Sequence, residues 1–243
     1  MAIEIFNRQE LKFVITTQQY TRILRGLQPH MQLDKHNENG QTYRLYNLYI
    51  DTEDHALIRH SITKPVVYKE KLRIRSYTKF EDNPIVFLEI KKRYKRITNK
   101  RRTKIPYDEA LAFIAEGVPP QLHNYMNQQV TRELTTILSG RMYQPKTFIA
   151  YDRLAFSGHG KTRDLRVTFD TNITARRHGG VDAINLLDTD HIVMELKSSY
   201  NAPLWLVDLL TENGIYKQSF SKYGREYLHH LKANQSRQET IYA

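Results

Sequence analysis

Charged and apolar side chains alternate along several segments of the chain, with the period of two that is typical of β-strands. The clearest case is residues 68–96, where two alternating runs flank a turn signal at 81–84. Leu72 and Ile74 lie on the apolar face of the first run. The pattern predicts a hairpin with one apolar and one charged face. The charged face carries Lys69, Lys71, Arg73 and Arg75 in the first strand, and Glu89, Lys91 and Arg93 in the second.

The same alternation predicts further strands, and helical periodicity predicts the helices between them. Thr16 or Thr17 is placed to cap a first helix that we expect to end near His30. The residues after Lys232 are polar, and we expect 233–243 to be a frayed tail. Strands are predicted over 3–15, 42–51, 147–156, 163–171 and 191–199, and helices over 16–30, 52–58, 107–117 and 121–139, with two more inside 203–231.

Rows of cations on one face of a sheet allow two interpretations. In the first, Lys and Arg side chains point into solvent from an ordinary antiparallel sheet. In the second, helices cover the apolar face, and the charged faces surround a polar interior where a polyanion offsets the repulsion among the cations. Charges recur at the polar positions of five strands, which favours the second. We therefore expect a single α+β domain over 1–243: a closed antiparallel β-barrel tunnel with a polar lumen, flanked by helices.

The net charge favours an anionic partner. The 243 residues have a formal net charge of +11, and phosphate polymers, nucleotides, nucleic acids and anionic membrane surfaces all fit that sign. We expect no nucleic acid, because the aromatic residues fall mainly at apolar positions. The sequence shows neither a signal peptide nor an apolar run long enough to cross a bilayer, so we expect a cytoplasmic protein without a transmembrane segment.

Several familiar catalytic motifs are excluded. The chain has no cysteine, which removes thiolate zinc sites and thiol nucleophiles. Its ten histidines show no zinc-binding spacing. Residues 155–162 resemble a loose P-loop, but the alternation from Thr162 onward predicts a strand where a P-loop needs a helix. We therefore expect 157–161 to be a turn.

A repeated Glu-x-Lys pair gives the charged face its chemistry. A separation of two places both side chains on one face of a strand. The cations can bind phosphate oxygens and the carboxylates can bind a divalent ion, although any single pair is common by chance. The pairs are Glu10/Lys12, Glu89/Lys91 and Glu195/Lys197, and they accompany Arg73, Arg75, Arg153 and Arg166.

At these residues the chain resembles the triphosphate tunnel metalloenzymes, and within them the polyphosphate polymerase (VTC) domain. The resemblance runs from Arg8 to about Arg225 in the family's order. Arg8 stands where the wider superfamily has the first Glu of an ExExK signature, which disfavours a thiamine-triphosphatase or adenylate-cyclase site with two N-terminal metal carboxylates. The matching motifs are Arg8-x-Glu10-x-Lys12-Phe13, Lys71-Leu72-Arg73-Ile74-Arg75, Phe87-Leu88-Glu89-Ile90-Lys91, Tyr151-Asp152-Arg153-x-Ala155-Phe156, Arg166-x-Thr168-x-Asp170-Thr171, Met194-Glu195-Leu196-Lys197 and Phe220-Ser221-Lys222-Tyr223.

The resemblance implies synthesis of inorganic polyphosphate from the terminal phosphate of ATP, with Mn²⁺ or Mg²⁺ as cofactor. It is also compatible with a membrane-protein partner. It implies Glu195 as a metal ligand, with Glu10 as a second-rank ligand. The residues implied in catalysis are Lys12, Arg73, Arg75, Lys91, Arg153, Arg166 and Lys222, and Lys71 and Lys197 join them in substrate binding.

Two other functions stay open on the sequence alone. One is a metal-dependent triphosphatase of the same fold, and the other is a noncatalytic module that binds polyphosphate. Glu195 bears on this choice, because a carboxylate in a basic site weakens the attraction for a polyanion and is of no use to a binding module. Its alternative role is a structural ion pair with Lys197 or a neighbouring arginine.

Overall fold

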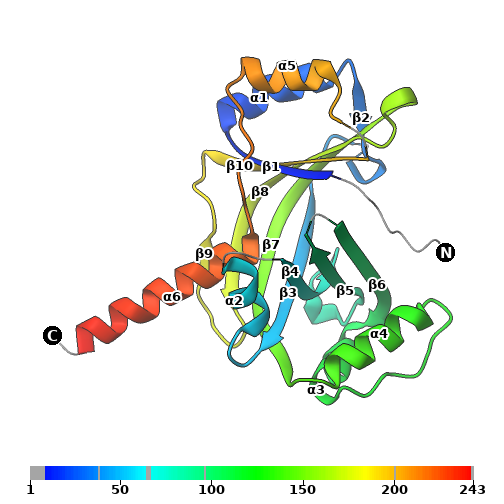
Figure 1. Cartoon of the computed structure of the whole chain (residues 1–243), viewed down its shortest axis with the longest axis vertical. Helices are drawn as coiled ribbons and strands as arrows, with labels where there is room; N and C mark the ends of the chain where they lie inside the picture. Colours follow the sequence, from blue (N-terminus) through cyan, green and yellow to red (C-terminus); the bar gives the residue numbers. More distant parts are fainter. Residues whose placement is uncertain (1–8, 38, 64–66, 96, 200, 242–243) are drawn as a thin grey trace.

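One curved antiparallel sheet organises the molecule, and helices pack against it (Figure 1). The computed structural model describes residues 9–37, 39–63, 67–95, 97–199 and 201–241. The strand order is β1-β10-β8-β7-β3-β4-β5-β6, while β2 pairs with β7 and β9 with β8. The strands are β1 (Gln9–Thr16), β2 (Met31–Leu33), β3 (Tyr43–Thr52), β4 (Tyr68–Ser76), β5 (Ile85–Tyr94), β6 (Ile97–Pro106), β7 (Tyr143–Gly158), β8 (Arg166–Arg177), β9 (Ala183–Asn185) and β10 (His191–Ser198).

Helices pack on the sheet in three pairs, each with its own hydrophobic core, and two of these pairs cover the convex side. The α1 and α5 helices pack on β1, β10 and β8 through a core that includes Ile23 and Leu206. The α3 and α4 helices cover β4 to β6 around Phe113 and Leu134. The third core, around Ile58, joins α2 and α6 to Tyr49 and Tyr151, whose side chains lie on the opposite, concave face in the middle of the sheet. The helices are α1 (Thr17–Leu27), α2 (Ala56–Ile62), α3 (Tyr107–Glu116), α4 (Gln128–Leu138), α5 (Leu204–Glu212) and α6 (Lys222–Ile241).

The two faces of the sheet follow the alternation in the sequence. Leu72 and Ile74 are buried against the helices of the convex side. Arg73 lies directly opposite Tyr49 on β3 and Glu89 on β5, so these three side chains share the concave face. The predicted common polar face of the hairpin is therefore confirmed.

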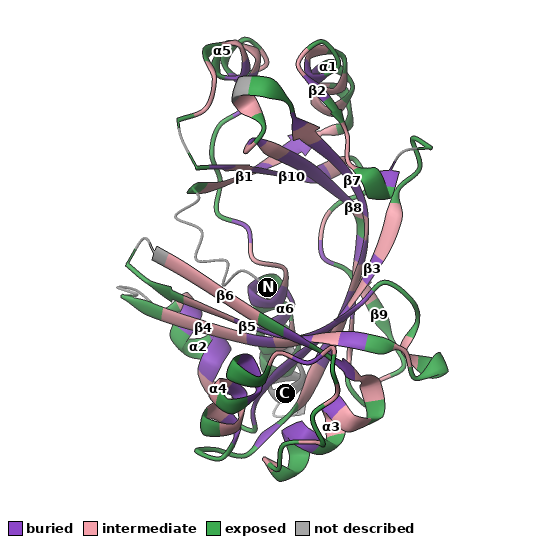
Figure 2. Cartoon of the chain, turned by 90° about the vertical axis from the view of Figure 1, so that its right-hand side faces the viewer, coloured by how far each residue is buried: buried purple, intermediate pink, exposed green. Residues whose placement is uncertain are grey.

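The predicted closed barrel is wrong. β1 and β6 are the two ends of the sheet, and no strand in the described part of the chain joins them. Figure 2 shows the sheet curved into an open C, with β1 and β10 facing β4 to β6 across the opening. The outer edge of β1 is used otherwise: the backbone C=O of Lys12 accepts a hydrogen bond from the N–H of Gln218 at 2.8 Å. Alternation determines which face a residue occupies, whereas closure requires pairing between the first and last strands.

Most predicted elements are confirmed, and the differences have local causes. Thr16 caps α1 through a reciprocal capping box with Gln19. The α4 helix begins at Gln128 rather than near 121, because the Asn127 side chain caps it by accepting a hydrogen bond from the N–H of Val130. The part of the first predicted strand at 3–8 lies outside the described residues.

Three further segments differ in extent from the prediction. β7 runs to Gly158 and a 3-10 turn follows at Gly160–Thr162, which confirms a turn rather than a P-loop. The cationic run 98–104, where the sequence pattern predicts a turn and the start of a strand, lies wholly within β6. The α6 helix ends at Ile241 rather than near Leu231.

Helix α6 is anchored by its first two turns and then projects away from the sheet (Figure 1). The hydroxyl of Tyr223 donates a hydrogen bond to the Asp51 carboxylate at 3.1 Å. Glu226 forms an ion pair with Arg177 of β8 at 2.6 Å, and its side chain is only 3% exposed. Burial raises the pKa of Glu226 to about 7, although Arg177 acts in the opposite direction.

This shift predicts a pH-dependent contribution of Glu226 to stability. Its pKa is higher in the folded chain than its ordinary value of 4.5, so the folded state binds more protons between these values and the free energy of unfolding falls as the pH rises. As the pH rises from about 5 to about 8, we expect the free energy of unfolding of Glu226→Gln to increase relative to that of the wild type by up to about 3 kcal/mol. Urea unfolding across this range measures the difference. Glu116→Gln, on an exposed side chain, is the control, and a difference for Glu226→Gln that does not vary with pH contradicts the prediction.

Candidate functional site

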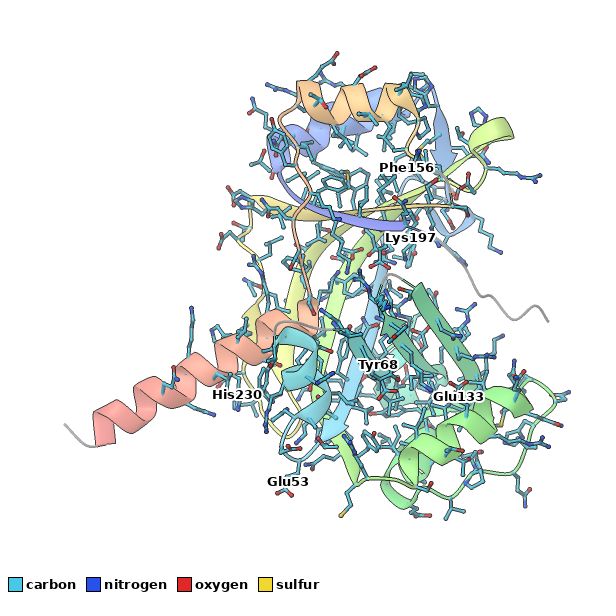
Figure 3. The ribbon with its side chains drawn as sticks, viewed as in Figure 1. Glu53, Tyr68, Glu133, Phe156, Lys197 and His230 are labelled. Atoms are coloured by element: carbon cyan, nitrogen blue, oxygen red, sulfur yellow. The ribbon has the colours of Figure 1, made fainter. Side chains whose placement is uncertain are left out.

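The concave face carries a network of charged side chains from both halves of the sheet. Residues opposite one another in antiparallel strands share a face, so the polar positions of neighbouring strands converge there. Figure 3 shows Lys197 between the upper strands and the lower hairpin. The network consists of Glu10, Lys12, Lys71, Arg73, Arg75, Glu89, Lys91, Lys100, Arg153, Asp170, Glu195, Lys197 and Lys222.

Asp170 joins two strands and a helix within this network. Its side chain is fully buried. Arg153 of β7 donates two hydrogen bonds to it, with Nε–Oδ1 at 2.6 Å and Nη2–Oδ2 at 2.8 Å, and Lys222 Nζ of α6 lies 2.6 Å from Oδ2. Burial acts to raise the pKa of Asp170, but Arg153 and Lys222 outweigh it and lower the pKa to about 2. The carboxylate is therefore ionised and holds both cations in place.

Glu89 has the same role in the lower hairpin. Its side chain is 1% exposed, and its Oε2 accepts a hydrogen bond from Arg73 Nε at 2.8 Å. Lys100 of β6 lies 2.6 Å from Oε1. Burial lowers the pKa of Lys100 to about 7, and Arg73 and Arg75 act in the same direction, although Glu89 acts to raise it. The protonation of Lys100 therefore depends on the negative charge beside it, which at present is that of Glu89.

Polar uncharged side chains orient the two arginines of β4. Arg75 Nε donates to Asn47 Oδ1 at 3.0 Å, and its Nη2 donates to the Tyr151 hydroxyl at 3.0 Å. Arg73 Nη1 donates to the Tyr49 hydroxyl at 3.4 Å. Both guanidinium groups are thereby held in defined directions, which suits the recognition of phosphate oxygens.

Two carboxylates lie on neighbouring strands at the edge of the sheet. Glu195 of β10 pairs with Lys197 at 2.7 Å. Glu10 of β1 pairs with Lys12 at 3.2 Å and, across the opening of the sheet, with Lys91 of β5 at 2.8 Å. Burial and the charge of Glu195 both act to raise the pKa of Glu10, but Lys91 and Lys12 outweigh them and lower it to about 2. Despite its burial, Glu195 also has a pKa well below its usual range, because of Lys197, Lys12 and Arg153.

These two carboxylates fit a divalent metal ion. Mg²⁺ in particular binds through one or two carboxylates, while substrate phosphates and water complete its coordination shell. The repulsion between Glu195 and Glu10 shows that their charges interact, and a cation between them relieves it. Glu195 and Glu10 are therefore the residues that would hold the ion.

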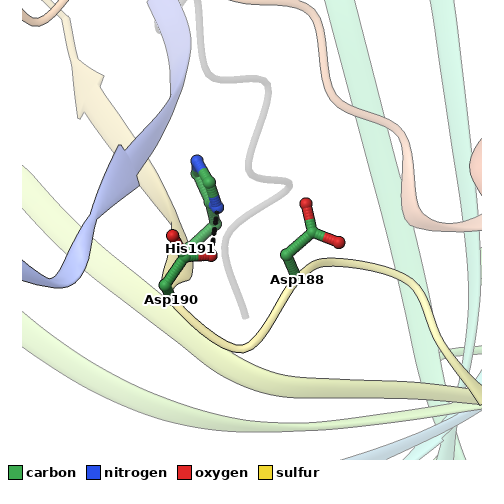
Figure 4. Close-up of side chains that lie close together, drawn as sticks. All are labelled: Asp188, Asp190 and His191. Carbon is green, nitrogen blue, oxygen red and sulfur yellow. Dashed lines mark hydrogen bonds and ion pairs between the residues drawn. The ribbon is translucent and has the colours of Figure 1, made fainter.

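A second group of potential ligands lies outside this network. The ligand atoms of Asp188, Asp190 and His191 lie within 4.8 Å of one another, at the start of β10 (Figure 4). His191 Nδ1 is already 2.6 Å from the Asp190 carboxylate, and both aspartates are exposed. Exposed acidic groups of this kind are common without a metal, so we assign no function to them.

The structure brings nearly all of the residues implied by the sequence onto one face. Lys12 Nζ donates to the backbone C=O of Phe220 at 3.3 Å, and Lys71 Nζ donates to Ser221 Oγ at 2.7 Å, so two strands reach the segment before α6. Arg166 lies opposite Lys197 but at the margin, where it pairs with Asp34 at 3.1 Å.

Asp170 and Lys100 of the network, and Ser221 beside it, were not assigned a role from the sequence. Asp170 occupies a polar position of its strand, but only the fold shows that it pairs with Arg153. Lys100 belongs to a cationic run that resembles solvated surface, although the spacing of Thr98, Lys100 and Arg102 already alternates as in a strand. Ser221 gives no sequence signal beyond its motif, because a single serine before a helix is usually only a cap.

The described part of the chain contains no helix both long and apolar enough to span a bilayer.

No curated protein matches the sequence significantly. Two solved structures share the fold at low identity. A Bacillus halodurans protein named as an adenylate cyclase has a TM-score of 0.53 and 15% identity, over 90% of this chain and 94% of its own. The Hippeastrum protein HpAC1, named as an adenylyl cyclase and described with a dominant triphosphatase activity, has a TM-score of 0.52 and 16% identity, over 88% and 92%.

The sequence also matches a family model over nearly its whole length. The model is that of the VTC domain, and the match covers residues 7–230. This range contains every member of the charged network. The chain therefore belongs to the VTC domain family.

Proposed function

We propose that the protein is a metal-dependent polyphosphate polymerase, which transfers the terminal phosphate of ATP to a growing chain of inorganic polyphosphate. One observation carries the proposal: cations outnumber carboxylates in a largely buried network that spans the concave face. Arg75, Arg153 and Glu195 are each less than 10% exposed. Such an excess of buried cations is costly unless an anion offsets it, and a linear polyphosphate carries negative charge along its whole length.

The arrangement of the cations suits positioning of phosphoryl groups. Phosphoryl transfer depends on in-line alignment and on neutralising the oxygens of the transferred group, so it needs no protein nucleophile. Arg73 and Arg75 present guanidinium groups from β4, Arg153 does so from β7, and Lys222 adds an ammonium from α6. We assign these four, with Lys12, Lys91 and Arg166, to the reacting phosphates, and Lys71 and Lys197 to the remainder of the substrate.

The carboxylates distinguish this site from a simple polyanion trap. Glu195, with Glu10 beside it, would hold Mn²⁺ or Mg²⁺, and the ion supplies charge neutralisation of the phosphate oxygens when bound. In its absence Lys197 and Lys12 offset the carboxylate charges. A module that only binds polyphosphate gains nothing from these carboxylates, which supports an enzyme.

A triphosphatase is the second candidate. The fold is shared with a Hippeastrum protein described with that activity, and the side chains of Lys91 and Lys197 are 37% and 36% exposed, so water reaches the edge of the network. Hydrolysis and polymer synthesis differ only in whether water or a phosphate oxygen attacks. ATP incubated with the protein and Mn²⁺, followed by separate assays for polymer and for free phosphate, distinguishes the two.

Substrate binding is expected to stabilise the fold. A ligand that binds only the folded chain raises the melting temperature by mass action, so inorganic triphosphate and polyphosphate are expected to raise it. Duplex DNA at equal charge is expected to raise it much less. Arg73→Ala is expected to remove most of the increase, whereas Arg59→Ala, which removes an exposed partner of Asp54, should retain it. An equal increase with DNA and polyphosphate is evidence for a general cationic surface.

Turnover is expected to depend on Glu195. Glu195→Gln preserves the shape of the side chain and removes the ligand charge, so polymer formation with Mn²⁺ should fall by about two orders of magnitude or more. Polyphosphate affinity in chelator, measured by calorimetry, should be retained or increased because a negative charge has gone. Glu116→Gln on an exposed site of α3 is the matched control. Near-normal synthesis by Glu195→Gln removes this residue from the metal site.

Asp170 is expected to control stability in the absence of substrate. Asp170→Asn leaves Arg153 and Lys222 without their buried counter-charge, which should lower the free energy of unfolding by about 3–5 kcal/mol. Triphosphate should restore more stability to this variant than it adds to the wild type, because it supplies the missing charge. Urea unfolding with and without triphosphate measures both effects. Asp54→Asn, in an exposed ion pair, should change little, and a failure of triphosphate to restore Asp170→Asn argues that phosphate does not reach this point.

A further inference from the structure

The segment before α6 places a serine hydroxyl against a lysine inside the charged network. Lys71 Nζ of β4 lies 2.7 Å from Ser221 Oγ. Ser221 immediately precedes α6, and its Oγ also accepts a hydrogen bond from the N–H of Gly224 at 3.1 Å. Because these interactions use Oγ as an acceptor, the hydroxyl proton is available for donation. A close pair of serine and lysine is one of the arrangements by which proteins activate a serine oxygen.

The surroundings of Ser221 suit a phosphate group. Lys12 Nζ reaches the backbone C=O of Phe220 at 3.3 Å, and Lys222 follows Ser221 directly in the chain. Three cations assigned to substrate phosphates therefore reach or lie within residues 220–222. The N-terminus of the long helix α6 adds the partial positive charge of its free N–H groups.

Lys71 has the properties of a proton acceptor. It projects from β4 into the network, where burial lowers its pKa to about 8; Lys12 and Lys91 act in the same direction, and Tyr49 opposes them. A fraction of the amine is thus neutral near physiological pH. In that state Nζ can accept the hydroxyl proton of Ser221 along the contact the two groups already make.

From this geometry we propose that Ser221 is a phosphoryl acceptor and that the protein catalyses its own phosphorylation at this residue. This inference rests on the proposed use of ATP. Ser221 Oγ forms a bond to the γ-phosphorus of ATP while the bond from that phosphorus to the β,γ-bridging oxygen breaks. ADP leaves with the electron pair of the broken bond. The hydroxyl proton passes to Lys71, which becomes an ammonium ion, and the products are phosphoserine and ADP. Phosphoryl transfer needs a well-positioned acceptor more than a strong base, and Lys71 and Gly224 hold the acceptor in place.

The product fits the site that forms it. Phosphoserine adds a charge of about −1.5 to −2 near neutral pH. The ammonium group of Lys71 contacts Ser221 Oγ directly, and that of Lys12 contacts the C=O of the preceding residue, Phe220, so both can offset this charge. A serine that serves only to cap α6 also accounts for the hydrogen bond from Gly224. That simpler role predicts no phosphate on Ser221, so the two interpretations differ in a measurable product.

Mass spectrometry of the protein after incubation with ATP and Mn²⁺ tests the proposal. We expect phosphate on the peptide that contains Ser221. Ser221→Thr keeps the hydroxyl and the cap and should still be labelled, whereas Ser221→Asn keeps a capping side chain without the hydroxyl and should not. Ser219→Ala, at an exposed serine of the same segment, should be labelled like the wild type. Lys71→Met should slow labelling by about tenfold or more.

The outcomes separate this inference from the proposed function. Polymer formation without phosphate on Ser221 overturns the inference and leaves the polymerase standing. Labelling that persists in Ser221→Asn, or that maps to another residue, also overturns it. Absence of both polymer and ATP consumption counts against the polymerase and the acceptor together. If Ser221→Asn fails to fold by circular dichroism, peptide mapping of the wild type and of Ser221→Thr still decides which residue carries the phosphate.

Discussion

The structure depends on one electrostatic constraint: cations gathered on the buried face of a sheet need counter-charges. Asp170 and Glu89 supply them, each fully or almost fully buried and each bound by two cations from different elements. Removing a buried charge from water costs several kcal/mol, which only good geometry and further hydrogen bonds offset. Asn47 and Tyr151 provide such bonds to Arg75. The carboxylates therefore determine where the strands and α6 meet.

This constraint also shapes the response of the site to an anion. Without substrate, the carboxylates neutralise the cations of this face. Phosphate oxygens of the proposed substrate would have to replace these carboxylates as partners of the cations, or share the cations with them. Cations with lowered pKa values, such as Lys71 at about 8 and Lys100 at about 7, regain proton affinity when negative charge approaches. Under the proposed function, we therefore expect binding of a polyanion to be coupled to proton uptake. The same coupling would give Lys71 its two proposed roles, as a cation for phosphate and as a neutral partner for Ser221.

The open edge of the sheet connects the site to the C-terminal helix. A backbone hydrogen bond from Gln218 occupies β1 at Lys12, and the side chains of Lys12 and Lys71 reach the residues that precede α6. Lys222 then binds Asp170 from the first turn of α6, while Tyr223 and Glu226 hold the helix to Asp51 of β3 and Arg177 of β8. The segment 215–222 therefore contacts strands from both halves of the sheet. Across the opening between β1 and β6, side chains and this segment connect the two halves, in place of a ladder of backbone hydrogen bonds.

The sequence determined the faces of the strands, because a period of two assigns every side chain of a strand to one side. Lys71, Arg73, Arg75, Glu89 and Lys91 were predictable as one polar face for that reason, as was the cap of α1, which depends on adjacent residues. Closure of the sheet was not predictable, because it depends on whether distant edges pair, and here Gln218 takes the bond at Lys12. Ser221 likewise meets Lys71 across 150 positions of the chain, and Lys222 meets Asp170 across 52. Local pattern decides which way a side chain points, and only the tertiary fold decides which charge it meets.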